Sequence, residues 1–129
     1  MTKPLKKILY VEDEPDIAAI AQIALVDIGG FELKYCNSGS LALAAIEGFK
    51  PDLFLIDVMM PEMDGTTLLK EIRKIPAYEQ TPIIFMTAKT QAAEVKEYKA
   101  LGAIDVITKP FDPMQLAQKI TEIWDHHYA

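Results

Sequence analysis

The chain has 129 residues, of which 50% are hydrophobic and 25% charged, and its formal net charge is −6. This composition is typical of one globular domain, here expected to span residues 1–129, and no apolar run approaches the ~20 residues of a membrane span. The acidic balance argues against a nucleic-acid surface, which needs basic side chains to neutralise phosphates. Cys36 is the single cysteine, and with no signal-peptide pattern the sequence favours a cytoplasmic protein.

The first half of the chain alternates short apolar runs with helical patterns. Residues 8–11 predict a strand buried on both faces. Beyond Pro15, apolar residues recur at the spacing of an amphipathic helix, which the glycine pair at 29–30 is expected to end. The residues of this stripe are Ile17, Ile20, Ala21, Ala24, Leu25 and Ile28. Residues 31–36 predict a second strand, and residues 40–47 a second helix.

The second half continues the same alternation. Its predicted elements are a strand at 53–56, a helix at 66–74, a strand at 82–86, a helix at 91–101 and a strand at 105–108. We expect Leu68, Ile72 and Ile75 to face inward, and Gly102 to end the fourth helix. Residues 112–113 (Asp-Pro) are expected to cap and open a last helix. The inward stripe of that helix consists of Leu116, Ile120, Ile123 and Trp124.

Five strand–helix alternations with short connections predict an α/β fold, in which a five-stranded parallel sheet carries helices on both faces. In such sheets, ligands bind beyond the carboxyl ends of the strands. Polar residues follow four of the five predicted strands. These residues are Glu12, Asp13, Asp57, Thr87 and Lys109. The sequence therefore predicts a polar site at this edge of the sheet.

The residue types at this edge point to metal and phosphoryl chemistry. Three carboxylates beside one ammonium leave an excess of negative charge, which requires a bound divalent cation or a protonated acid. An all-oxygen site open to water suits Mg²⁺. With the charge neutralised, Asp57 is the expected nucleophile for phosphorus, because a carboxylate can form an acyl phosphate. Lys109 and Thr87 are expected to hold phosphoryl oxygens.

Four ordered motifs resemble those of response-regulator receiver domains. Residues 52–65 (DLFLIDVMMPEMDG) resemble the central motif of that family, and residues 11–14 (VEDE) resemble its acidic pair. Residues 86–88 (MTA) are similar to its hydroxyl turn, and residues 108–111 (TKPF) to its lysine motif. The motifs extend over most of the chain, so the resemblance concerns the whole fold.

The resemblance implies a flavodoxin-like, doubly wound sheet of strand order 2-1-3-4-5 with five helices. It also implies a phosphorelay function, in which Asp57 receives a phosphoryl group from a sensor histidine kinase, a phosphotransfer protein or a small phosphodonor. Glu12, Asp13, Asp57 and the Met59 backbone carbonyl would bind Mg²⁺. The chain would be no enzyme beyond its own phosphorylation and dephosphorylation, and the Lys109–Pro110 bond would be cis.

The same resemblance assigns output to the fourth helix, fifth strand and fifth helix, a face that is expected to bind a protein target or form a homodimer. Lys96, Tyr98, Lys99 and Trp124 belong to these elements. The chain departs from the family pattern at Val106, where many receivers have a Tyr or Phe that turns inward on activation. A β-branched side chain has few rotamers and no ring to bury, so we expect only modest coupling of phosphorylation to this face.

Three other interpretations remain open from the sequence. A phosphatase that forms an aspartyl phosphate usually has a second Asp two residues after its nucleophile, a position held by Met59 here. A flavodoxin-like cofactor binder would need a Gly-rich phosphate loop where Glu12 and Asp13 stand. The third interpretation is a degenerate receiver that acts only as a scaffold, although the acceptor, metal and lysine positions are all present.

Overall fold

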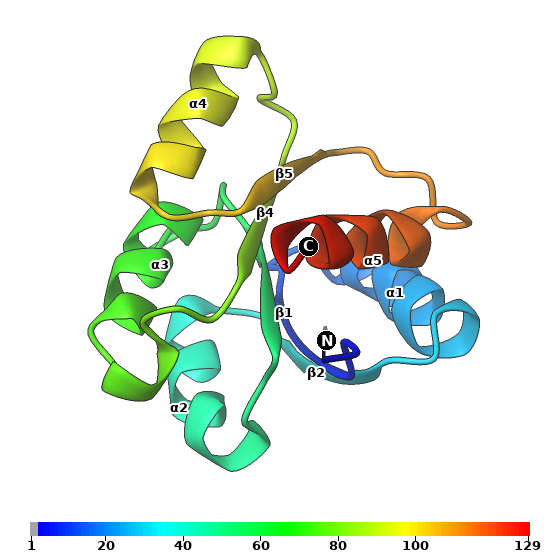
Figure 1. Ribbon diagram of the computed structural model, residues 1–129, viewed down its shortest axis with the longest axis horizontal. Coiled ribbons are helices and arrows are strands. Elements are labelled where there is room, and N and C mark those ends of the chain that lie inside the picture. Colours follow the sequence, from blue (N-terminus) through cyan, green and yellow to red (C-terminus); the bar gives the residue numbers. More distant parts are fainter. Residues whose placement is uncertain (1–2) are drawn as a thin grey trace.

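A computed structural model describes residues 3–129, which form a five-stranded parallel sheet of order β2-β1-β3-β4-β5 (Figure 1). The strands are β1 (Lys7–Val11), β2 (Glu32–Cys36), β3 (Leu53–Asp57), β4 (Ile83–Thr87) and β5 (Asp105–Thr108). The helices are α1 (Pro15–Gln22), the π-helix η1 (Ile23–Ile28), α2 (Gly39–Phe49), α3 (Gly65–Arg73), the 3₁₀ helix η2 (Pro76–Tyr78), α4 (Ala92–Leu101) and α5 (Leu116–His127). The predicted fold class and strand order are confirmed.

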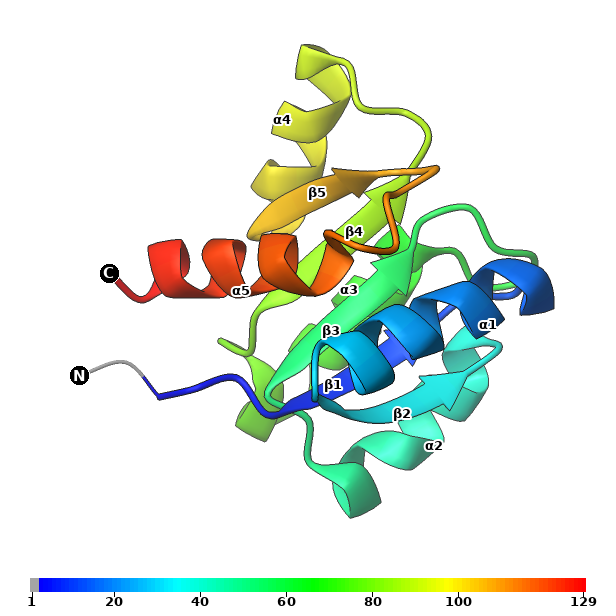
Figure 2. The same ribbon diagram turned by 90° about the vertical axis from the view of Figure 1, so that its right-hand side faces the viewer.

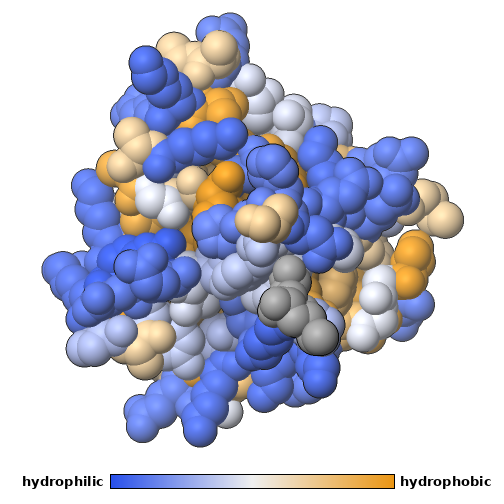
Figure 3. Space-filling view, viewed as in Figure 1, coloured by the Kyte–Doolittle hydropathy of each residue, from blue (hydrophilic) through white to orange (hydrophobic). Residues whose placement is uncertain are grey.

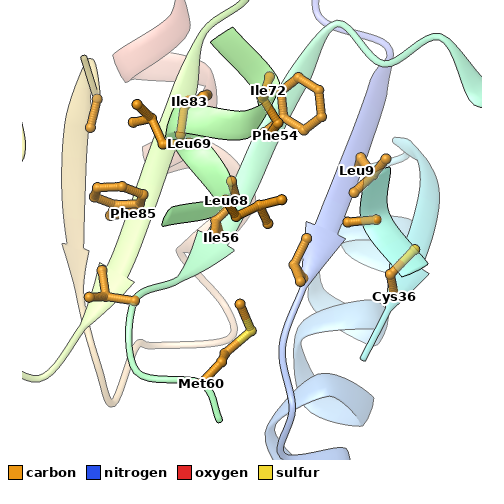
Figure 4. Packing of buried hydrophobic residues seen from close by; sticks show 14 of the residues in the cluster. Leu9, Cys36, Phe54, Ile56, Met60, Leu68, Leu69, Ile72, Ile83 and Phe85 are labelled. Carbon is orange, nitrogen blue, oxygen red and sulfur yellow. The ribbon is translucent and has the colours of Figure 1, made fainter. Parts of the chain in front are cut away.

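Helices cover both faces of the sheet, with α2, α3 and α4 on one side and α1 and α5 on the other (Figure 1). Alternate residues of β3 project to opposite faces of the sheet. Phe54 and Ile56 pack toward α3, whereas Leu53 and Leu55 pack toward α5. Figure 4 shows the first layer, in which Leu68 and Ile72 meet the strands. Because both faces are buried, the strands read as continuous apolar runs. Each fully buried aliphatic side chain contributes about 1.5–3 kcal/mol to folding.

The first helix differs from its predicted apolar stripe. Ala21, Ala24 and Leu25 are buried as expected, but Ile20 and Ile28 are each 48% exposed. The helix widens into η1, where the Gly29 N–H donates to Ala24 O five residues earlier. A π-turn shifts the inward face relative to a 3.6-residue repeat, which accounts for the exposure of Ile28 within η1 but not for that of Ile20, which lies in α1. Hydrophobic residues therefore reach the surface along this segment, at the right-hand side of Figure 3.

Two helix starts also differ from the prediction. The third helix begins at Gly65, and the Asp64 carboxylate caps it by accepting a 2.9 Å hydrogen bond from Thr67 N–H. Asp64 is therefore the N-cap residue of α3. Asp112 accepts from Met114 N–H at 2.9 Å, but only a turn follows, and α5 begins at Leu116.

The inward stripe of α5 is confirmed at Leu116, Ile120 and Trp124, which are all buried. The Trp124 indole N–H donates to the Lys3 carbonyl oxygen at 2.8 Å. Trp124 is 3% exposed, so the expectation that it contributes to a protein-binding face is wrong. The tryptophan instead attaches the segment that precedes β1 to α5. Among residues 3–129, no helix is long and apolar enough to cross a membrane.

Candidate functional site at the carboxyl edge of the sheet

The five strands run in the same direction, and Figure 2 shows their arrowheads together at the edge opposite the chain ends. Glu12 and Asp13 directly follow β1, and Asp57 is the last residue of β3. Thr87 is the last residue of β4, and Lys109 follows β5. The side chains that the sequence predicts to form a site therefore leave the sheet at one edge.

Glu12, Asp13 and Asp57 form a tight acidic cluster. One carboxylate oxygen from each lies within 4.8 Å of the others. Glu12 and Asp57 are buried, at 0% and 1% exposure, while Asp13 is partly exposed. Among the described residues, Asp13 Oδ1 and Asp57 Oδ2 are buried oxygens without a hydrogen-bond partner. Unpartnered buried oxygens of this kind require a cation, a water or a proton.

Lys109 supplies the positive charge of the cluster. Its Nζ lies 3.0 Å from Glu12 Oε1 and 3.3 Å from Asp57 Oδ1. The Lys109 N–H donates to the Thr87 carbonyl at 2.9 Å, which continues the β4–β5 ladder beyond the end of β5. The Lys109–Pro110 bond is cis, as the family resemblance predicts.

The charges in the cluster shift two pKa values. Burial raises the pKa of Asp57 to about 7, and the neighbouring Glu12 adds to this effect while Lys109 opposes it. Burial tends to lower the pKa of Lys109, but Glu12 and Asp57 outweigh burial and raise it. A second positive charge near Asp57 would lower this pKa and keep the carboxyl group fully ionised at neutral pH.

Close backbone packing shapes the loop after Asp57. The Gly65 N–H donates to Val58 O at 2.9 Å, and a Cβ at Gly65 would lie 2.7 Å from Asp57 O. Only glycine allows α3 to start this close to the end of β3. The DG pair in the central motif therefore has a structural role: Asp64 caps α3, and Gly65 lets the helix approach the site.

Two further predicted residues occupy different positions at the site. Thr87 is buried, and its hydroxyl oxygen accepts a 3.1 Å hydrogen bond from Lys89 N–H. The Met59 side chain is 60% exposed and adds no donor to the carboxylate cluster. The role of the Met59 backbone carbonyl stays a prediction.

Two tyrosines near the cluster were missed by sequence reasoning. The Tyr35 hydroxyl donates to the Glu12 carbonyl at 2.7 Å. Tyr10 is fully buried, two residues before Glu12, and its hydroxyl has no hydrogen-bond partner among the described residues. A phenol inside an otherwise aliphatic strand was the available signal, because a buried tyrosine hydroxyl usually has a partner.

The donor set fits a hard divalent cation. It offers carboxylate oxygens from two neighbouring strands, and two of these oxygens lack any other partner among the described residues. Hard cations prefer oxygen ligands, whereas softer metals favour the thiolate and imidazole groups that are absent from this cluster. Cys36 is buried in the core at the end of β2, as a small hydrophobic residue would be.

Comparisons with known proteins agree with this geometry. Residues 8–121 match the family described as the response regulator receiver domain. Curated relatives include the DNA-binding response regulator MtrA of Mycolicibacterium smegmatis, which is 36% identical over 89% of this chain and 49% of its own length. PhoP of Bacillus subtilis, an alkaline phosphatase synthesis transcriptional regulatory protein, is 36% identical over 92% of this chain and 48% of its own. The chain thus spans about half the length of these relatives.

Solved structures show the same similarity. The chemotaxis response regulator CheY4 of Vibrio cholerae superposes with a TM-score of 0.85 and 32% identity, over 92% of this chain and 98% of that one. A putative response regulator from Chloroflexus aurantiacus superposes with a TM-score of 0.83 and 32% identity, over 95% and 99% of the two chains. These matches favour a receiver over the phosphatase and cofactor-binding alternatives. The chain belongs to the response regulator receiver domain family and has the fold of that family, which acts in two-component phosphorelay signalling.

Proposed function

We propose that this chain is one receiver module in which Asp57 accepts a phosphoryl group in a Mg²⁺-dependent reaction. The observation that carries the proposal is the state of the Asp57 carboxylate. Lys109 contacts Oδ1, while Oδ2 has no hydrogen-bond partner among the described residues. An oxygen without a hydrogen bond keeps its lone pairs available for attack on phosphorus.

The transfer step balances with residues of this chain and a phosphohistidine or acyl-phosphate donor. An Asp57 oxygen forms a bond to phosphorus as the bond from phosphorus to the donor's nitrogen or oxygen breaks. The leaving imidazole takes up a proton, whereas a leaving carboxylate needs none. Lys109 and Thr87 then hold phosphoryl oxygens through an ammonium and a hydroxyl, which stabilise the charge that spreads over these oxygens.

Glu12, Asp13 and Asp57, together with the Met59 carbonyl, would hold the Mg²⁺ ion. When bound, the ion supplies positive charge that neutralises the carboxylates and the incoming phosphoryl group. Lys109 alone cannot do this, because it already faces both Glu12 and Asp57. The phosphoryl group would otherwise enter a site of excess negative charge.

The proposed donors are a sensor histidine kinase, a phosphotransfer protein or a small phosphodonor, and the chain would catalyse only its own phosphorylation and dephosphorylation. We place output on α4, β5 and α5, facing a protein target or a second copy. Lys96 and Lys99 are exposed on α4, and none of the residues of α4 is fully buried. A helix with so few buried contacts can shift at low cost. MtrA is a DNA-binding regulator by name, but the acidic chain described here gives no reason to extend that property to it.

Labelling with acetyl phosphate, with and without Mg²⁺, tests the proposal. We expect one phosphoryl group per chain in the presence of Mg²⁺, sensitive to hydroxylamine as acyl phosphates are, and very slow labelling after chelation. The Asp57→Asn variant should not be labelled. No labelling of the native chain by acetyl phosphate or phosphoramidate would leave only a scaffold role.

A further inference from the structure

Tyr10 is a buried tyrosine of the inner strand β1, two residues before the acidic cluster begins at Glu12. It pairs with Tyr35 of β2 on one side and with Leu55 of β3 on the other. Glu12 and Asp57 follow Tyr10 and Leu55 by two residues along the same two strands. Because side chains two apart on a strand share a face, the phenol lies on the face from which these two carboxylates project.

The hydroxyl of Tyr10 is a donor without a recorded acceptor. It is fully buried and, within residues 3–129, has no hydrogen-bond partner. The nearest charges act on it strongly: burial raises the pKa of Tyr10 well above its usual range, and Glu12 and then Asp57 raise it further. A buried hydroxyl without a hydrogen-bond partner is unfavourable, so a phenol beside two acids indicates an acceptor close to it.

Tyr35 already fixes the backbone at this point. Its hydroxyl donates to the Glu12 carbonyl at 2.7 Å, and its ring centroid lies 5.7 Å from that of Tyr10. This pair of rings restricts how far the Tyr10 phenol can move. On the outer side, Lys109 contacts Glu12 Oε1, and the Glu14 N–H lies 3.3 Å from Glu12 Oε2. Lys109 and the Glu14 N–H thus contact the Glu12 carboxylate from the loops at the edge of the sheet. Tyr10 is the hydrogen-bond donor that the core offers to the same carboxylate.

We propose that Tyr10 is a positioning residue of the phosphoacceptor site, whose hydroxyl donates to the Glu12 carboxylate, directly or through one water. The bond fixes the direction of the Glu12 oxygens toward the cation that Glu12 would share with Asp13 and Asp57. Groups that orient metal-binding carboxylates from behind typically change metal affinity when removed. This inference rests on the proposed function, since it assigns a supporting group to the same site.

The test compares Tyr10→Phe with the native chain in Mg²⁺ titrations by calorimetry, and in acetyl phosphate labelling at saturating Mg²⁺. We expect Mg²⁺ to bind about tenfold more weakly, at the lower end of such losses. The labelling rate at saturating Mg²⁺ should stay within about twofold, because Tyr10 does not touch the phosphoryl group. Tyr78→Phe is the matched control, since it removes a phenolic hydroxyl from η2, which precedes β4 and so lies at the other edge of the sheet.

A double-mutant cycle separates positioning from packing. If Tyr10 acts through Glu12, the Tyr10→Phe change should have no further effect on Mg²⁺ affinity in a Glu12→Gln background. Equal Mg²⁺ affinity in the native and Tyr10→Phe chains, or additive losses in the cycle, would overturn the inference. A native chain that binds no Mg²⁺ would instead overturn the proposed function.

A measurement on the native chain does not depend on the variant folding. In a chain labelled with ¹³C at the tyrosine Cζ, the Tyr10 resonance should shift when Mg²⁺ is added, because its acceptor then binds a cation. The Tyr78 resonance should stay unchanged. A Tyr10 resonance that does not respond to Mg²⁺ binding, with the binding itself seen by calorimetry, would contradict a hydrogen bond to Glu12.

Discussion

Lys109 and the buried Glu12 form a partly buried ion pair of 3.0 Å, although 97 positions separate them in the chain. The same ammonium lies 3.3 Å from Asp57 Oδ1. One cation is thus shared by two buried carboxylates, while an oxygen of Asp57 stays without a partner in the described structure. The site therefore has an excess of negative charge, and this excess is the basis of the first three predictions.

Asp57→Asn should abolish labelling by acetyl phosphate, because the amide is a poor nucleophile for phosphorus. Asp52→Asn is the control, since Asp52 precedes the same strand at its other end. There its carboxylate accepts hydrogen bonds from Lys7 N–H at 2.9 Å and Lys3 Nζ at 2.8 Å. The control should be labelled normally. Normal labelling of the Asp57→Asn chain would show that another residue is the acceptor.

Mg²⁺ should raise the thermal midpoint at neutral pH, because a ligand of the native state stabilises it by mass action. At a Mg²⁺ concentration tenfold above its dissociation constant, the gain is about 1.4 kcal/mol, or roughly 4–6 °C for a domain of this size. Calorimetry with chelator and with excess Mg²⁺ measures the change. The Asp13→Asn and Asp57→Asn double variant should lose most of it, and an unchanged native midpoint would argue against a metal site.

Metal-free stability should fall as the pH rises from 5 to 8. The pKa of Asp57 is about 7 in the folded chain, compared with 3.8 for an unperturbed aspartate side chain. Between these two pH values, the folded state therefore binds more protons than the unfolded state. The contribution of Asp57 to stability is therefore fully present at low pH and lost as the pH rises through 7. Urea unfolding at intervals across this range, with chelator present, measures the slope.

Asp57→Asn should flatten this slope, because the amide does not titrate. Saturating Mg²⁺ should flatten it as well, since the cation favours the ionised carboxylate. A metal-free native chain that gains stability between pH 5 and 8 would show that Asp57 is already ionised at pH 5.

The Asp64→Ala variant should destabilise the fold by about 1 kcal/mol, as is typical when an N-cap side chain is lost. The Asp64 carboxylate accepts hydrogen bonds from both Thr67 N–H and Thr66 Oγ1, each at 2.9 Å. Asp64→Asn retains a cap and should lose much less. Equal unfolding free energies of the Asp64→Ala and native chains in urea would show that the cap contributes nothing.

Phosphorylation should change partner affinity at the output face by about 1 kcal/mol or less, at the low end of allosteric couplings. Val106 pairs with Phe85, whose face carries the Tyr98 ring at a centroid distance of 5.4 Å. Burial raises the pKa of Tyr98, and the Thr87 hydroxyl opposes this shift. Tyr98 and Val106 both pack against the core cluster that contains Phe85. Chemical-shift changes on adding beryllofluoride should therefore reach Tyr98.

Val106→Tyr should strengthen the effect of phosphorylation on partner affinity only when Tyr98 is also replaced by a small residue, as in Tyr98→Ala. Without that second change, the two tyrosine rings would compete for the same space against Phe85. Partner binding or self-association with and without beryllofluoride gives the coupling for each chain. A hundredfold response of the native chain would show that this domain needs no aromatic residue at position 106.

The order of strands and helices could be predicted from the sequence, and so could the residues that lie at the carboxyl edge of the sheet. Hydrophobic periodicity is a local property, so strands and helices could be predicted to within a few residues. The parallel arrangement then required Asp57, Thr87 and Lys109 to leave the sheet at one edge. The sequence also predicted which side chains carry charge there, because residue type alone sets that.

The burial of particular side chains and the register of the strands could not be predicted from local sequence patterns. The widened turn of η1 left Ile28 exposed, and core packing buried Trp124, whose indole N–H donates to the Lys3 carbonyl. The placement of Asp57 beside Glu12 depends on the register between β1 and β3, which pairs Tyr10 with Leu55. Register and packing are set by contacts between distant segments. Those contacts bring the carboxylates of Glu12, Asp13 and Asp57 together, although Asp57 lies more than forty positions from the other two.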